Sequence, residues 1–503
     1  MILSRKYVLL AFLTIVVYAF MLNEFNRIVI LKNNPSNIES NCRSLVQNST
    51  VFSVDNEWYL PQIKNFIHGK GFTSNPDIAH YDVRRTPVYP IFYGIHYLVF
   101  GEAKSFYFIR FTQILLYALA TIALFFATYN FTHHKKISII SAVLFGFNPT
   151  LVSYLYFTIT EALSPSLVCF LLYFLSRCYL YNKKKDWFLT GLFLATGTLC
   201  RPSVFFFIIA LFFAIVLINR KSFKAIFTGI LYVLLGSGIL FVPHLIRNYI
   251  LTKGDFILLE KYYGDPMNLG LPNIELRHWI SCWTNPSDYS SEVISFRMMN
   301  TIIKDSSALT KKRFIEEKML ELPKRATLAN KPEDIKSAYE SLYDYYVAKF
   351  NHADSAVLNS TELNCLSKMA KLKIEFVQNK PIQYYIITPI LFLKSVMLQS
   401  NASTLAMLDN YKTSLLKKTI KIILYLLNIF LFISLIGNLF YFPKYFLIKS
   451  ICLLFVFVNF IYIIYIIQYF EARYLVPVFP VMYISGAVFF TETYERLKRR
   501  LNL

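Results

Sequence analysis

The chain contains 503 residues, of which 55% are hydrophobic and 17% aromatic, and its mean hydropathy is +0.44. Only 16% of the residues are charged, against about 25% in typical soluble domains, which argues against a soluble globular protein. The net charge of +22 lies mostly in short loops between apolar runs, and no basic groove interleaved with stacking aromatic residues is visible, which argues against nucleic-acid binding.

The apolar residues come in blocks separated by short basic clusters, a pattern typical of membrane-spanning helices, which need roughly 20 apolar residues each. We predict spans at about 7–22, 106–129, 137–156, 162–181, 187–200, 203–219, 224–244, 420–441, 446–467 and 475–491. Their even number places both termini on one side of the membrane. The basic ends Arg5–Lys6 and Arg496–Arg500 predict that this side is the cytoplasm.

This pattern predicts three parts: an N-terminal transmembrane catalytic module at 1–244, which includes a first extracytoplasmic loop at 23–105; an extracytoplasmic loop domain at 245–419; and C-terminal transmembrane helices at 420–503. Inside the loop domain, Lys311–Lys318 and Glu333–Lys349 predict amphipathic helices. The fold class predicted is an all-α polytopic membrane protein with about 10–12 transmembrane helices and a mostly helical loop domain.

Two further apolar stretches predict helices that lie at the outer membrane interface. Thr86–Phe100 is short and contains prolines, which suits an interfacial helix in the first loop. The stretch near 382–399 is long enough to span, but it contains Lys394, and a lysine at the centre of a span costs about 2.5–3.5 kcal/mol. We therefore predict an interfacial helix there, and a span is the alternative.

The cysteines offer one candidate crosslink and no metal site. Cys282 and Cys365 both fall in the predicted outer loop domain, so a disulfide between them is one alternative. Because no CxxC or His/Cys spacing occurs, we predict no bound metal and no other cofactor; a divalent metal has no support in the sequence.

Three carboxylates are candidates for catalysis, because charged groups beside a membrane are costly and suggest a function. Asp55 and Glu57 lie in the first outer loop, where either would serve as the base that activates a hydroxyl. Glu161 follows Thr160 at the outer end of a predicted span and would bind a hydroxyl or assist Asp55. The alternative for Asp55 and Glu161 is a structural role in capping helices.

Arginines gather on the same predicted face as these carboxylates, and the planar fork of a guanidinium matches the geometry of a phosphate. Arg201 follows a run of about 14 apolar residues, which covers only about 21 Å, so we expect it to lie at depth beside an anion. The alternative is that these residues anchor helices at the interface. The candidates are Arg84, Arg85, Arg201, Arg247 and Arg473.

The sequence resembles the GT-C superfamily of membrane glycosyltransferases, on the branch of the protein O-mannosyltransferases and aminoarabinose transferases (glycosyltransferase family 39 and its bacterial relatives). The resemblance covers roughly 1–260 and 420–495, in family order. It departs from the family pattern at Val88, where relatives often have glycine, and at 55–57, where many carry an Asp-Glu pair. The matching stretches are Asp55–Gly71, Arg85–Pro90 with Phe100-Gly101, Thr160–Leu163, Arg201-Pro202, Pro243–Tyr249 with Gly254, and Glu471–Tyr474 with Pro477 and Pro480.

The resemblance implies a polyprenyl-phosphate-linked sugar donor, an extracytoplasmic active site and inversion at the anomeric carbon, without a nucleotide sugar. It implies that Asp55, Glu57 and Glu161 are catalytic. Donor-phosphate binding would fall to the five arginines together with Tyr89, His244 and Tyr474. The acceptor would be lipopolysaccharide, another glycan, a lipid or a protein, and acceptor specificity would lie in 260–415. The expected location is a bacterial inner membrane.

Two other functions are alternatives. An O-antigen polymerase or ligase is also polytopic with a large outer loop, but the early Asp55 loop and the final Glu471–Tyr474 segment argue against it. A transporter or flippase of lipid-linked sugars predicts charged residues near mid-membrane and pseudo-symmetric halves. Here the polar candidates gather at one face and the halves differ, which favours the transferase.

Overall fold

The structure is a computed structural model that describes residues 5–33, 56–73, 83, 85–252, 254, 257–258, 269–284, 289–398, 415–440, 444–467 and 472–501. The regular elements of these residues are helices, which confirms the all-α class. The chain divides into two compact units. The first unit comprises Met1–Glu260, Gln399–Phe460 and Ala472–Leu503, and the second comprises Lys261–Leu398 and Ile461–Glu471.

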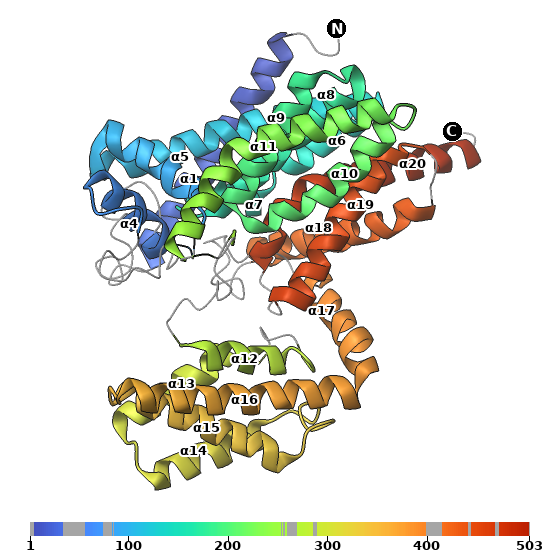
Figure 1. Cartoon of the computed structure of the whole chain (residues 1–503). Helices are drawn as coiled ribbons and strands as arrows, with labels where there is room; N and C mark the ends of the chain where they lie inside the picture. Colours follow the sequence, from blue (N-terminus) through green and yellow to red (C-terminus); the bar gives the residue numbers. More distant parts are fainter. Residues whose placement is uncertain are drawn as a thin grey trace. The chain divides into compact units, whose positions relative to one another are not determined.

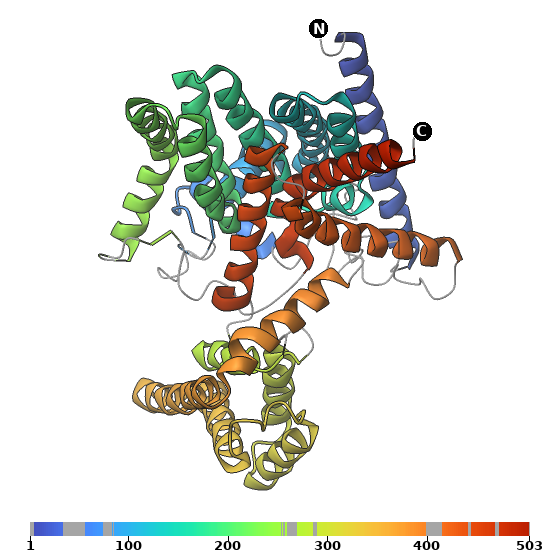
Figure 2. The ribbon, with the colours of Figure 1, turned by 90° about the vertical axis from the view of Figure 1, so that its right-hand side faces the viewer.

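The first unit is a helical bundle in which α9 packs against α8 and α11, α5 packs against α8, and α20 packs against α6 and α18 (Figures 1 and 2). Its helices are α1 (Arg5–Asn33), α4 (Asn56–Ile67), α5 (Val88–Thr132), α6 (Lys135–Gly146), α7 (Pro149–Tyr154), α8 (Ser164–Tyr181), α9 (Lys184–Cys200), α10 (Phe207–Ile218), α11 (Phe223–Leu251), α18 (Leu415–Phe440), α19 (Phe446–Ile461) and α20 (Phe479–Arg500).

Glycines set the closest helix contact of this bundle. A Cβ atom on Gly191 of α9 would lie 2.1 Å from the carbonyl oxygen of Val233, and one on Gly236 of α11 would lie 2.0 Å from the carbonyl oxygen of Phe188. The two backbones therefore touch at both points, and only glycine permits this approach. Small residues at such contacts are the usual way for membrane helices to pack without a hydrophobic driving force.

Seven helical segments within the described residues are long and apolar enough to cross a membrane, which confirms a polytopic membrane protein. Three of the ten predicted spans form shorter helices instead. The span predicted at 137–156 is divided between α6 and α7, because Asn148 caps α7. The span predicted at 187–200 forms α9 with 17 residues, and the one predicted at 203–219 begins as a 3₁₀ turn and forms a segment shorter than a span, Pro202–Ile218.

The predicted interfacial stretch Thr86–Phe100 is helical from Val88 and continues into α5 through a kink at Gly101. Gly101 has φ 73° and ψ 174°, a conformation that side-chain-bearing residues rarely adopt. The kink separates the first part of α5 from the membrane-length segment Lys104–Thr132. The interfacial position of 86–100 stays a prediction.

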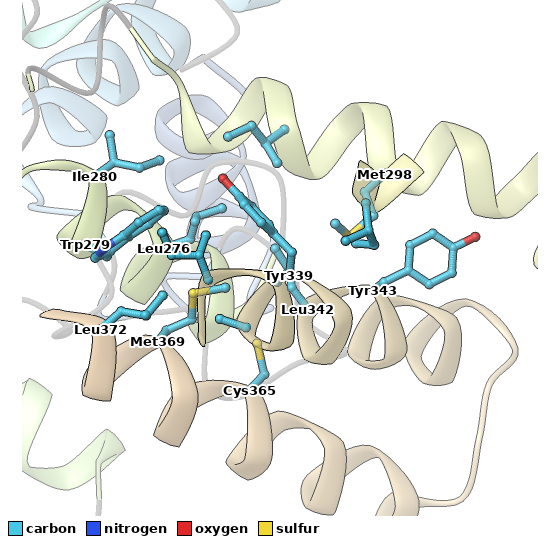
Figure 3. Packing of buried hydrophobic residues seen from close by; sticks show 14 of the residues in the cluster. Leu276, Trp279, Ile280, Met298, Tyr339, Leu342, Tyr343, Cys365, Met369 and Leu372 are labelled. Carbon is cyan, nitrogen blue, oxygen red and sulfur yellow. The ribbon is translucent and has the colours of Figure 1, made fainter. Parts of the chain in front are cut away.

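The second unit has its own hydrophobic core. Trp279 and Leu276 of α12 face Met369 and Leu372 of α16, and Tyr339 lies on the neighbouring α15 (Figure 3). The predicted amphipathic helices of this region form as α14 and α15. Its helices are α12 (Leu271–Ile280), α13 (Ser291–Lys304), α14 (Ala308–Glu321), α15 (Pro332–Phe350), α16 (Ser355–Asn379) and α17 (Thr388–Met397).

Most of this unit lies inside the predicted loop domain 245–419, and Ile461–Glu471 joins it. The stretch near 382–399 forms a π-helical turn, Gln383–Ile387, followed by α17. The first residue of α17, Thr388, donates a hydrogen bond from Oγ1 to the carbonyl oxygen of Cys282 at 2.8 Å. The boundaries of the predicted domains and the interfacial placement of this stretch remain predictions.

The alternative of a Cys282–Cys365 disulfide is excluded, because both thiols are free and buried. They lie in the same core cluster, and burial raises the pKa of each to about 12. Since the thiolate is the reactive form, we expect both cysteines to resist a maleimide at pH 7.5 in the folded protein and to react in denaturant. Peptide mass spectrometry of the labelled chain measures this, and prompt labelling of the native protein would contradict the buried arrangement.

Candidate functional site

Glu161 lies in the first unit, in the turn just before α8. After α7 ends at Tyr154, the chain makes the 3₁₀ turn Thr160–Ala162, and α8 begins at Ser164 with Pro165 in its first turn. Proline suits that position because the missing N–H has no partner within the helix there. The side chain of Glu161 is 3% exposed, so its charge requires partners inside the protein.

Two arginines from distant parts of the chain supply those partners. Arg201 Nη1 lies 2.8 Å from Glu161 Oε1, and Arg473 Nε lies 3.8 Å from the same oxygen. The hydroxyl of Thr160 donates to Glu161 Oε2 at 3.0 Å and accepts from Arg201 Nη1 at 3.1 Å. Glu161 is therefore part of an ion-pair network, which goes beyond the simple cap considered as its alternative.

Arg201 is oriented by the chain that surrounds it. It follows the last residue of α9 in an extended conformation (φ −144°, ψ 114°), because Pro202 disfavours a helical residue before it. Its second nitrogen, Nη2, donates to the carbonyl oxygen of Arg473 at 3.1 Å, and its guanidinium lies 5.8 Å from the ring centroid of Tyr474. The network thus brings two guanidinium groups to one carboxylate.

A second group of residues, around Arg85, is joined to the Glu161 network by a hydrogen bond to the backbone. Thr86 donates from Oγ1 to the carbonyl oxygen of Cys200 at 3.3 Å, so the residue after Arg85 contacts the residue before Arg201. The guanidinium of Arg85 lies 5.2 Å from the ring centroid of Tyr59, and that ring meets Tyr89 edge to face at 5.7 Å. Arg85 therefore packs against Tyr59 of α4. The Thr86–Cys200 hydrogen bond joins its neighbour in the chain to the neighbour of Arg201.

Gln113 is a residue that the sequence analysis missed. Its Oε1 accepts from the hydroxyl of Tyr89 at 2.9 Å, and its Nε2 donates to the carbonyl oxygen of Leu155 at 2.9 Å. Gln113 thereby connects the start of α5 to the turn that precedes Glu161. The signal was a glutamine in the middle of an apolar span, where polar side chains are costly.

The end of α11 holds two nearby loops. Arg247 donates from Nη2 to the carbonyl oxygen of Phe72 at 3.0 Å, and its guanidinium lies 5.2 Å from the Phe72 ring. His244 Nε2 lies 2.9 Å from the carbonyl oxygen of Leu258, and Asn248 Nδ2 donates to that of Ile257 at 2.8 Å. Arg247 therefore joins the segment after α4, and His244 contacts backbone in the segment after α11.

A buried ion pair joins α1 to α5. Arg110 is 2% exposed, and its Nη2 lies 2.6 Å from Glu24 Oε1; Arg27 Nε lies 2.8 Å from Glu24 Oε2. Arg110 sits one helical turn before Gln113. The sequence analysis passed over this pair, although an arginine inside a predicted span was a visible signal for it.

Asp55 and Arg84 lie outside the described residues, as does the side chain of Glu57; α4 begins at Asn56, directly after Asp55. The part of the chain that the structure describes contains no group of three or more His, Cys, Asp or Glu side chains suited to a metal ion. The prediction of no metal and no cofactor stays a prediction.

The model of the dolichyl-phosphate-mannose-protein mannosyltransferase family matches residues 84–246, a stretch that holds Arg85, Glu161 and Arg201. This stretch is similar to that family, and the predicted resemblance to the GT-C superfamily is confirmed. The bacterial origin stays a prediction.

Among solved structures, the archaeal oligosaccharyltransferase AglB from Archaeoglobus fulgidus, in complex with an inhibitory peptide and a dolichol-phosphate, matches with a TM-score of 0.45 and 13% sequence identity. The match covers 96% of this chain and 52% of that one, so the chain spans about half the length of that protein. No curated protein sequence matches the chain.

Proposed function

We propose that the protein is a membrane glycosyltransferase that moves one sugar from a polyprenyl-phosphate carrier to the hydroxyl of an extracytoplasmic acceptor, with inversion. The observation that carries the proposal is the network of Glu161, Arg201 and Arg473, of which the first two lie in the domain that matches the mannosyltransferase family. The acceptor is a glycan, a lipid or a protein. In this proposal the protein works in the inner membrane, with both termini in the cytoplasm.

The arginines act on the leaving group. As the bond from the anomeric carbon to the phosphate oxygen breaks, negative charge grows on the lipid phosphate, and prearranged donors stabilise that charge. Arg473 keeps about a third of its side chain exposed (33%) while it pairs with Glu161. In the proposal the lipid phosphate approaches Arg473 from this exposed side, and the neighbouring Arg201 adds positive charge.

Glu161 is a positioning residue in this proposal. Arg201 and Arg473 both approach its Oε1, and the Thr160 hydroxyl donates to its Oε2. Both carboxylate oxygens are already engaged by these partners, and the charge of the carboxylate holds the two guanidinium groups in place. Glu161 thus orients the two guanidinium groups, and the proton of the acceptor hydroxyl goes elsewhere.

Asp55 is the proposed base, with Glu57 as the alternative. The acceptor oxygen attacks the anomeric carbon as the phosphate departs, and the hydroxyl proton passes to the carboxylate. Such general-base catalysis typically contributes 10²–10⁴-fold, roughly, in rate. Arg84, Arg85, Tyr89, Arg247, His244 and Tyr474 complete the proposed donor-binding set, with Tyr89 and His244 acting through the segments that they hold.

The proposal is tested by transfer in proteoliposomes that contain the full chain, with radiolabelled sugars on polyprenyl phosphate and a crude envelope fraction as acceptor. We expect label to move from the lipid to acid-stable envelope material. A parallel assay follows the leaflet of the labelled lipid. If the lipid changes leaflet and no label reaches the acceptor, the transferase proposal fails and a transporter replaces it. If label appears only in chains of repeated units, a polymerase replaces it.

A further inference from the structure

A cavity of about 410 Å³ lies in the first unit, away from the Glu161 network. It is formed where α5 and α10 end and where α19 begins, with Tyr179 of α8 on one wall. A volume of this size lies within the range of small-ligand pockets, roughly 300–1,000 Å³. Arg220 supplies a positive charge at its rim beside the imidazole of His133, and Phe131 and Ile218 supply apolar wall.

The helices themselves place this cavity opposite to the candidate active site. α8 begins three residues after Glu161, and the cavity is reached near its other end, at Tyr179. With 18 residues, α8 is about 27 Å long. α10 likewise begins soon after Arg201 and reaches the cavity at its last residue, Ile218. The two sites therefore lie at opposite ends of the same bundle.

The acidic side chains found at this end already have cationic partners. Glu495 lies 3.0 Å from His134 and 3.7 Å from Lys444, and the buried Glu492 lies 2.7 Å from Lys449. These pairs engage two lysines and His134.

His133 and Arg220 form no ion pair with any residue that the structure describes, and both are exposed. Four exposed lysines lie close to them in the chain, in the turn after α10 and in the first turns of α6 and α11: Lys135, Lys136, Lys221 and Lys224. The rim of the cavity thus carries the positive charge of Arg220, which has no acidic partner among the described residues, and this suits an anion.

The wall below this rim is apolar and aromatic. Tyr179 and Tyr445 line the cavity beside Phe131 and Leu447, and tyrosine favours the level of the lipid headgroups, where one end of the ring is wet. A cationic rim above an apolar wall matches a molecule with a phosphate head and hydrocarbon chains. We propose that this cavity binds the phosphate headgroup of an anionic phospholipid, at the end of the bundle opposite to the candidate active site.

The test measures lipid binding to the purified, delipidated full chain by native mass spectrometry. Phosphatidylglycerol and phosphatidylcholine share their chains and differ in net charge. We expect wild type to prefer phosphatidylglycerol and Arg220→Gln to bind it about fivefold more weakly, since one basic residue near an anionic headgroup is worth roughly that much. Binding of phosphatidylcholine should not change, and Arg220→Lys should restore most of the preference.

Lys185→Gln is the matched control. Lys185 is exposed at the same end of the bundle, it carries the same charge and it does not line the cavity; we expect wild-type binding from it. Equal binding of the two lipids by wild type, or an Arg220→Gln protein that binds as wild type does, overturns the proposal. So does displacement of phosphatidylglycerol by an equimolar polyprenyl monophosphate, which would assign the cavity to the carrier lipid. Because no transfer is measured, these results do not depend on the proposed glycosyltransferase function.

Discussion

Replacement of Arg201 by alanine is expected to lower sugar transfer by about 10²–10³-fold, the usual cost of losing one prearranged donor to the developing charge of a transition state. Arg201 pairs with Glu161 at 2.8 Å and holds the carbonyl oxygen of Arg473 at 3.1 Å. Its loss therefore removes one positive charge. It also releases the segment that carries Arg473, the second positive charge. Transfer in proteoliposomes measures the effect, with rates normalised to folded protein.

The same substitution also lowers stability, because removal of one partner leaves a buried charge and costs about 3–5 kcal/mol in typical cases. The double variant Arg201→Ala/Glu161→Gln separates the two effects. It also removes the buried charge of Glu161 that has lost Arg201, so thermal unfolding should return toward wild type while transfer stays low. Recovery of transfer along with stability would show that Arg201 is only structural.

A matched control is available at the other end of α8. Arg177 Nε lies 2.7 Å from Asp186 Oδ1, and the Asp186 side chain is 2% exposed, so this pair resembles the Arg201–Glu161 pair in distance and in the burial of its acid. Arg177→Ala should destabilise the protein to a similar degree. Transfer per folded molecule should not change, because this pair lies at the end of α8 remote from Glu161.

Substitution of Asp55 by asparagine is expected to lower transfer by about 10²–10⁴-fold, the usual contribution of a general base, and to leave donor binding intact. α4 begins at the next residue, and Tyr59 in its first turn packs against Tyr89 and under Arg85. The sequence therefore brings Asp55 within one helical turn of a residue that contacts a candidate phosphate-binding arginine. Donor affinity and transfer are measured separately, in the same proteoliposomes.

Glu57→Gln is the companion variant, since it removes a carboxylate two residues away. We expect it to keep most of the transfer. If Glu57→Gln is inactive and Asp55→Asn is not, the base is Glu57. If both variants transfer sugar as well as wild type does, neither carboxylate is the base, and the proposed mechanism loses its proton acceptor.

The site was predicted unevenly. Glu161, Arg201 and Arg473 stood out in the sequence because each is a charged residue at the end of an apolar run, and the structure brings them together. Arg247 and His244 stood out for the same reason, yet they contact backbone carbonyl oxygens of loops. Charge at a membrane boundary identifies a residue that needs a partner, and it does not indicate whether that partner is a side chain, the backbone or a ligand.

The sequence by itself determined that the chain is an all-α membrane protein, because runs of apolar residues must satisfy their backbone hydrogen bonds within helices once they leave water. It also placed the helix break at Arg201-Pro202, since proline restricts the residue before it. Only the tertiary structure decided that Cys282 and Cys365 are buried free thiols and that Gln113 holds the turn before Glu161. It also decided that the carboxylate of Glu161 pairs with two arginines, which lie 40 and 312 positions away along the chain. Such contacts depend on how helices pack, as at Gly191 and Gly236, and packing is set by the shapes of many side chains together rather than by any local pattern.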